Sequence, residues 1–310
     1  MGEEAGECNG DVSPIALPDY GNSFVGILSM IPRLVRGMTR SVLLFLLVIS
    51  FAIPSAARVY EYQLNCDLGK GSAQNIRAGD FNITLTPENH LCRVAVVGRS
   101  KKPVFEYTSA GMQVFAGKDF TGDGEPDAII QADTHPYRLF VVSLGSHPGL
   151  VKTIENGYGF WLQNDCDDKR RRIWTADAAF QEDKELVNVV YHHDLMVPEI
   201  ALELRGTKLV DATPKCKGYF DEQVRLVRSS LTNSDISGFR AEKIADEFHR
   251  GEVKGYILKI VFAYLYSGRE NEAHQMLSEM WPKKDIDRIW NWIIAKRSEG
   301  TLRQAMPSAE

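Results

Sequence analysis

The segment Lys118-Asp119-Phe120-Thr121-Gly122-Asp123-Gly124-Glu125-Pro126-Asp127-Ala128-Ile129-Ile130 decides how the middle of this chain folds. Acidic side chains and two glycines cluster within the nine residues 119–127, and an apolar run follows at once. Carboxylates packed this closely repel one another unless a cation lies between them. A hard divalent cation such as Ca²⁺ takes roughly six to eight oxygen ligands, several of which a tight loop supplies. We therefore expect a cation-binding loop that leads directly into a strand.

The expected ligands are side-chain oxygens and one backbone carbonyl. They are the side chains of Asp119, Thr121, Asp123 and Asp127 and the carbonyl of Glu125. Gly124 allows the sharp turn, because glycine adopts φ > 0 without a steric penalty. The loop is not an EF-hand, since that motif needs a bidentate Glu at the twelfth position, where this chain has Ile130. The alternative is an acidic surface turn that binds no ion.

This pattern resembles the FG-GAP (VCBS-type) repeats of integrin-like β-propellers, whose signature is approximately Asp-Phe-Asn-Gly-Asp-Gly-x-x-Asp followed by apolar residues. The matching positions are Asp119, Phe120, Gly122, Asp123, Gly124 and Asp127. The chain departs from the signature at Thr121, where the family usually has Asn or Asp. The resemblance implies calcium binding by a propeller-like or related β domain.

A second segment, 165–176, aligns with this loop at a distance of 46 residues. In the alignment Lys169 replaces Asp123 and Ile173 replaces Asp127. A segment that has exchanged acids for bases cannot hold Ca²⁺. Its four consecutive basic residues, which begin at Lys169, are therefore expected to form a solvated turn, or to place positive charge where an ion would lie.

Composition excludes several classes of protein. The 310 residues are 44% hydrophobic and 25% charged, which is typical of globular proteins. A formal net charge of −5 does not favour nucleic-acid binding. A mean hydropathy of −0.22 argues against a protein with several membrane spans.

The first 57 residues are expected to be a leader. Three arginines precede an apolar core at 42–49, and small residues follow at 55–57, an order typical of a secretory signal peptide. The core is shorter than the ~20 apolar residues that a membrane span needs, although a single anchor is the alternative. Because signals begin near the initiator, we expect translation to start at Met30 or Met38, the alternative being a long tail from Met1. The mature protein would be secreted or periplasmic, with no membrane span.

The cysteines agree with export. Residues 58–310 contain Cys66, Cys92, Cys166 and Cys216, and an even number in an exported chain indicates two disulfides. Of the three possible pairings we favour 66 with 92 and 166 with 216, because each closes a loop within one segment. A zinc site is the alternative, but the chain has no Cys-x-x-Cys pair.

The rest of the chain divides into two predicted domains, which makes the expected fold α+β. Short β-branched runs between turn signals predict an all-β domain over 58–216, either propeller-blade-like or a sandwich. Helical patterns predict a small all-α domain over 218–303, with helices at 221–228, 241–248, 255–266, 269–280 and 285–296.

Part of this second domain resembles a tetratricopeptide repeat. The matching positions within 263–282 are Tyr264, Gly268, Ala273, Leu277 and Pro282. Only one such unit is visible, and stable arrays need about three, so a plain αα-hairpin is the alternative.

No sequence motif indicates catalysis. The chain has no P-loop, no dinucleotide-binding glycine pattern and no Gly-x-Ser-x-Gly elbow. His192 and His193 are adjacent, so on a strand they point to opposite faces. We therefore predict an exported, calcium-binding, non-catalytic module that contacts a protein or a surface ligand and binds no nucleic acid. The alternative is a secreted hydrolase that uses carboxylates across a cleft of the β domain.

Overall fold

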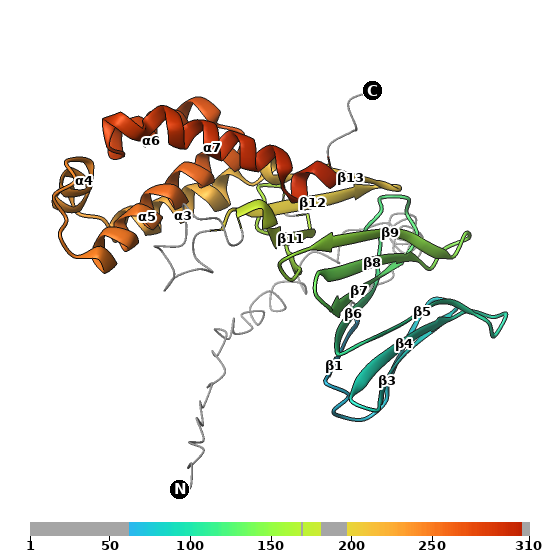
Figure 1. Ribbon diagram of the computed structural model, residues 1–310. Helices are drawn as coiled ribbons and strands as arrows, with labels where there is room; N and C mark the ends of the chain where they lie inside the picture. The colour runs from blue at the N-terminus through green and yellow to red at the C-terminus, as the bar shows by residue number, and fades with distance from the viewer. Residues whose placement is uncertain (1–61, 169, 181–196, 306–310) are drawn as a thin grey trace, which may run out of the picture. The chain divides into compact units, whose positions relative to one another are not determined.

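Strands make up the first part of the described chain and helices the last part (Figure 1). A computed structural model describes residues 62–168, 170–180 and 197–305. The predicted leader and His192 and His193 lie outside these residues. The order of sheets followed by helices confirms the predicted β-then-α layout. The described strands do not close into a barrel or a propeller.

The strands form three antiparallel sheets. The first contains β2 (Gln74–Ala78), β3 (Phe81–Glu88), β4 (Leu91–Val97) and β5 (Pro103–Ser109) in that order. The second has the order β1 (Tyr62–Asp67), β6 (Gly111–Lys118), β7 (Asp127–Asp133), β8 (Tyr137–Ser143) and β9 (Gly149–Asn156). The third contains β10 (Trp161–Gln163), β11 (Arg172–Ala176), β12 (Glu199–Arg205) and β13 (Lys208–Asp211).

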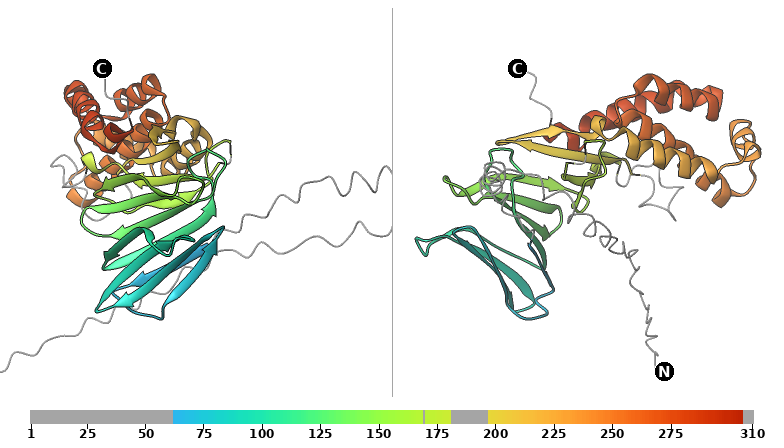
Figure 2. Two further views of the ribbon diagram at one scale, coloured as in Figure 1. Left: turned by 90° about the vertical axis from the view of Figure 1, so that its right-hand side faces the viewer. Right: turned by 180° about the vertical axis from the view of Figure 1, so that it is seen from behind.

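The central strands β7 and β8 of the five-stranded sheet are buried on both faces, which explains the unbroken apolar run after the acidic loop. Side chains of a strand alternate between faces. In β7, Ala128 and Ile130 belong to the hydrophobic cluster shared with the first sheet. Ile129, between them, belongs to a second cluster shared with the third sheet and the helices. Figure 2 shows the five-stranded sheet between its two neighbours. The start of β7, and with it the acidic loop, is therefore anchored in two cores.

Five α-helices follow the sheets: α3 (Lys217–Ser229), α4 (Asn233–Arg240), α5 (Glu247–Tyr266), α6 (Glu270–Met280) and α7 (Ile286–Glu299). The apolar helix α5 is the most buried, as its pattern predicts. It ends at Ser267, where Gly268 adopts a φ of 80°. Each helix in the described parts of the chain is too short or too polar to cross a lipid bilayer.

The predicted helix at 241–248 is wrong in position. A capping box between Thr232 and Asp235 starts α4 earlier, and α4 ends at Arg240. Glu242 then has a φ of 57°, which a helix does not allow. The Asp246 carboxylate accepts the N–H groups of Phe248 and His249 and starts α5 there. The caps override the helical pattern of the segment between them.

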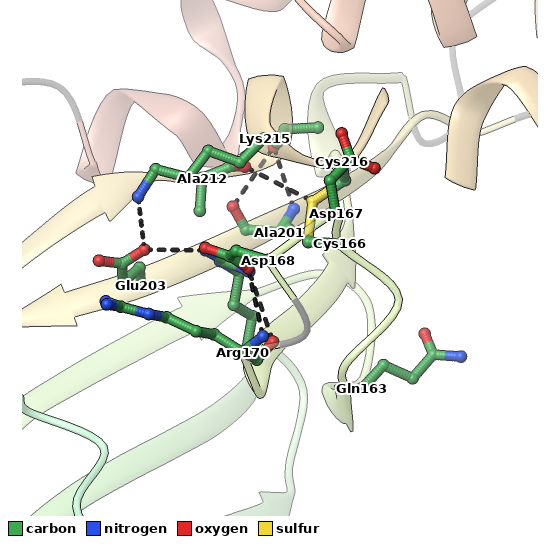
Figure 3. The surroundings of a disulfide bond; sticks show 12 residues. Gln163, Cys166, Asp167, Asp168, Arg170, Ala201, Glu203, Ala212, Lys215 and Cys216 are labelled. Atoms are coloured by element: carbon green, nitrogen blue, oxygen red, sulfur yellow. Dashed lines mark hydrogen bonds and ion pairs between the residues drawn. A yellow bond between two sulfur atoms is a disulfide. The ribbon is translucent and has the colours of Figure 1, made fainter. Parts of the chain in front are cut away.

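Both predicted disulfides are confirmed. Cys66 of β1 pairs with Cys92 of β4 and so joins the first two sheets. Cys166, which follows β10, pairs with Cys216 at the start of α3. Figure 3 shows the second disulfide beside the segment that carries Asp168 and Arg170. This bond fixes one end of that segment to the helices.

Candidate functional site

The acidic loop between β6 and β7 is organised by hydrogen bonds from its own backbone. The two carboxylate oxygens of Asp119 accept the N–H groups of Gly122 at 2.6 Å and Gly124 at 2.8 Å. Gly122 and Gly124 have φ angles of 79° and 86°, in the region that favours glycine. The turn predicted at Gly124 is thus present. The Asp123 carboxylate accepts the N–H of Glu125 at 2.9 Å.

Asp127 closes the loop from inside the protein. Its Oδ2 accepts the N–H groups of Phe120 at 2.8 Å and Thr121 at 2.9 Å. Its other oxygen, Oδ1, is buried and has no hydrogen-bond partner. Burial raises the pKa of the Asp127 carboxyl to about 6, although the two N–H groups oppose the shift. This is a buried carboxylate of which only one side is satisfied.

The remaining predicted ligands lie in the same loop. Thr121 is buried, with its hydroxyl 3.5 Å from Asp119 Oδ1. The Glu125 carboxylate points out of the loop and accepts the N–H and hydroxyl of Ser146 at 2.6 and 3.3 Å. Within the described residues, no group of three His, Cys, Asp or Glu side chains is arranged to hold a metal ion. The carboxylates are therefore close together in one turn but are directed at amides.

The loop forms one wall of a cleft of about 750 Å³. The other walls are the segment before β11 and the turn between β12 and β13. The N–H of Gly206 in that turn donates to the carbonyl of Thr121 at 2.8 Å, which joins two of the walls. Five of the lining residues are basic, namely Lys118, Arg170, Arg171, Arg172 and Arg205.

Arg172 is the structural centre of this basic segment. Its side chain is fully buried and donates two hydrogen bonds to the Asp168 carboxylate, both at 2.6 Å. Its Nη2 also lies 3.3 Å from Glu203 on the neighbouring strand. The hydrogen bonds from Arg172 hold the pKa of Asp168 well below its usual value. The expectation of a solvated turn is thus wrong for Arg172, because two carboxylates compensate its burial.

Glu203, which lines the cleft, hydrogen-bonds with three cationic side chains. It accepts hydrogen bonds from Lys215 at 2.9 Å and Arg205 at 3.2 Å, in addition to Arg172. Burial raises the pKa of Glu203, but these cations outweigh burial and the net pKa lies below the ordinary value. A carboxyl held ionised in this way is unsuited to act as a general acid near neutral pH.

Two other acids have raised pKa values, but neither lines the cleft. Burial raises the pKa of Asp177, which accepts hydrogen bonds from the Tyr266 hydroxyl at 2.6 Å and the Thr301 N–H at 2.9 Å. Burial likewise raises the pKa of Asp211, which accepts the N–H of Thr213. Asp177 joins the end of β11 to α5 and to the segment after α7. We therefore interpret it as part of the scaffold.

Sequence reasoning found the acidic loop but missed the basic wall. The spacing of Asp168 and Arg172 was a visible local signal. Glu203 and Arg205 lie more than thirty residues further on, and nothing near them in sequence links them to this segment. Only the pairing of β11 with β12 brings the two regions together.

Comparison of the chain with family models, with curated proteins and with solved structures found no match.

Proposed function

We propose that loop 119–127 binds Ca²⁺, and that the ion stiffens an exported, non-catalytic protein that contacts a protein or a surface ligand. The residues that would hold the ion are those of the FG-GAP-like pattern: Asp119, Thr121, Asp123, Asp127 and the carbonyl of Glu125. The two disulfides support export, because such bonds persist in oxidising compartments. The helical segment at 263–282, which resembles part of a tetratricopeptide repeat, is the proposed second contact region.

One observation carries the proposal: the buried Oδ1 of Asp127 has no hydrogen-bond partner. Burying a charged oxygen without a partner costs roughly several kcal/mol of free energy. Buried carboxylates are therefore normally paired or bound to a metal. The neighbouring Asp123 raises the pKa of Asp127 further and does not compensate it. A divalent cation among these oxygens would supply the missing positive charge.

The amide hydrogen bonds of the loop are compatible with an ion. A carboxylate offers about four lone-pair positions, so an oxygen that accepts one N–H retains capacity for a cation. The carboxylates of Asp119 and Asp123 would have to turn toward Asp127, since they are now directed at backbone amides. Binding thus includes a local rearrangement, and we expect an affinity of the extracellular kind, with a Kd of roughly 10⁻⁴–10⁻³ M.

The cleft favours binding over hydrolysis. Glycosidase-type hydrolysis needs two carboxyls, one of which is protonated to act as the acid. The acids that line the cleft are Asp119 and Glu203. The cations around Glu203 hold its pKa low. We therefore propose the non-catalytic role and not the hydrolase.

The test is thermal unfolding of the protein in EDTA and in increasing Ca²⁺. At ten times the Kd, Ca²⁺ should stabilise the native state by about 1.4 kcal/mol, because only the folded loop presents the ligands together. Asp123→Ala should abolish this gain. Asp80→Ala is the matched control, because Asp80 is an exposed turn residue that pairs with Arg99 outside the loop. The same melting temperature in EDTA and in 10 mM Ca²⁺, about ten times the weakest expected Kd, would exclude the site.

A further inference from the structure

The cleft beside the acidic loop has a charge opposite to that of the protein. Its five basic residues and two acidic residues, Asp119 and Glu203, give 5 − 2 = +3, whereas the whole chain has a net charge of −5. Lys215 and Asp168, which pair with these residues from outside the lining, add one charge of each sign, whereas Asp123 and Asp127 of the adjoining loop reduce the excess to 3 − 2 = +1. A concave positive site on a negative protein attracts anions selectively.

Two arginines are placed to donate into the cleft. Arg205 is 59% exposed and uses its Nε for Glu203, which leaves the outer edge of its guanidinium for a ligand. The main chain of Arg170 bonds to Asp168 and Arg172, and its side chain is exposed. Figure 3 shows the Arg170 side chain extending toward the end of the view where Glu203 lies, away from the disulfide. A guanidinium presents two parallel N–H groups that match the oxygens of phosphate or sulfate.

The floor and walls of the cleft are held in place before any ligand binds. The ion pairs of the buried Arg172 side chain with Asp168 and Glu203 fix the strand below the arginines. The hydrogen bond from Gly206 to Thr121 fixes the distance between the loop and the β12–β13 turn. Pre-organisation of this kind lowers the entropy lost on binding.

We infer that this cleft binds a small ligand that carries phosphate or sulfate ester groups. The volume of about 750 Å³ lies within the range of ordinary ligand sites, roughly 300–1,000 Å³. Asn164 and Lys118 add further lining groups at the rim. The inference goes beyond the proposed calcium site, because it depends on the arginines of a different segment and requires no metal ion.

The experiment is isothermal titration calorimetry of the whole protein in EDTA, with inorganic pyrophosphate and a sulfated disaccharide as separate probes. We expect at least one probe to bind, and binding to weaken as salt rises. Arg205→Gln and Arg170→Gln should each weaken it about tenfold, the loss of one charge-assisted hydrogen-bonding group. Both side chains are exposed, so the variants should melt like the parent protein.

Arg99→Gln is the matched control. Arg99 is an exposed arginine paired with a single carboxylate, as Arg205 is, but it lies in the turn between β4 and β5. It should leave the affinity unchanged. The inference is overturned if neither probe binds at 1 mM, or if Arg99→Gln weakens binding as much as Arg205→Gln. Preference for pyrophosphate or for the disaccharide identifies the source of the oxyanion. Because EDTA is present throughout, failure of the calcium proposal would not affect the result.

Discussion

At the start of β7, where the acidic loop ends, the buried charge is the carboxylate of Asp127, whereas at the start of β11 it is the guanidinium of Arg172. The two segments face the same cleft and align in sequence. Arg172 is matched by two carboxylates, Asp168 and Glu203. Asp127 is matched only by neutral groups, the N–H groups of Phe120 and Thr121 and the Thr121 hydroxyl, and its Oδ1 has no hydrogen-bond partner.

The protein therefore contains two kinds of buried charge, one compensated by charged side chains and one not. Where the counter-charge belongs to the chain, as at Arg172, the buried charge is compensated, although the buried Nε of Arg172 has no hydrogen-bond partner. At Asp127 the described residues supply no counter-charge to the buried Oδ1, and we propose that an ion from solution supplies it. Three predictions test whether this difference is real.

The largest effect is expected at Arg172. Arg172→Met should destabilise the native state by about 2–3 kcal/mol, because Asp168 loses two charge-assisted hydrogen bonds and Glu203 loses one of its three cations. Urea unfolding measures the change. Arg205→Met is the control: Arg205 contacts the same Glu203 but is 59% exposed, so it should change stability by less than about 1 kcal/mol. Equal losses of unfolding free energy in the two variants would show that the ion pairs of the buried Arg172 side chain stabilise the protein no more than the exposed pair of Arg205 does.

The second effect is a pH dependence at Asp127. Its native pKa of about 6 lies above the ordinary value of 3.8, so the folded state holds this proton more tightly than the unfolded state does. The resulting stabilisation is present in full below pH 3.8 and is lost as pH rises through about 6.

Asp127→Asn provides the comparison. In EDTA, the native protein should lose up to about 3 kcal/mol more than Asp127→Asn does between pH 4 and pH 7. Saturating Ca²⁺ should reduce that difference, because the ion compensates the ionised form. Urea unfolding at four pH values measures both. If the stability of the two proteins in EDTA changed with pH in the same way, the Asp127 carboxyl would not have a raised pKa in the folded state.

The smallest effect is expected at Glu125, which ties the acidic loop to the turn after β8. Glu125→Ala removes the acceptor of two exposed hydrogen bonds to Ser146 and should destabilise by about 0.5–1 kcal/mol. A Cβ at Gly145 would lie 1.5 Å from the Glu125 carboxylate, so Gly145→Ala should displace the same side chain. Alanine at 125 keeps a Cβ 2.7 Å from the new one, so part of the clash remains, and the double variant should lose less stability than the sum of the two single variants. Additive losses would contradict this coupling.

The acidic loop and the disulfides were predictable because their signals are local. The turn at Gly124 follows from the glycine and acid spacing, and the apolar run after Asp127 follows from the strand pattern. The pairings of Cys66 with Cys92 and of Cys166 with Cys216 follow from short loop closure. The metal ligation assigned to the loop stays a prediction.

The basic wall and the limits of one helix were not predictable in the same way. The four basic residues indicated a solvated turn, since nothing nearby showed that strand β12 would bring Glu203 against Arg172. The helical pattern at 241–248 was real, but the caps at Thr232 and Asp246 placed the helices on either side of it. In both cases a longer-range or a stronger local interaction outweighed the pattern.

Local sequence patterns suffice to predict the order of strands before helices, the turn in the acidic loop and the disulfide pairs. Each depends on residues close in the chain or on periodicity that a single segment carries. Only the tertiary structure decided which charges are buried with a partner and which are buried without one. Pairing of β11 with β12 brings Glu203 to Arg172, whose other partner Asp168 is local in sequence, and within the described residues it brings no partner to Asp127 Oδ1.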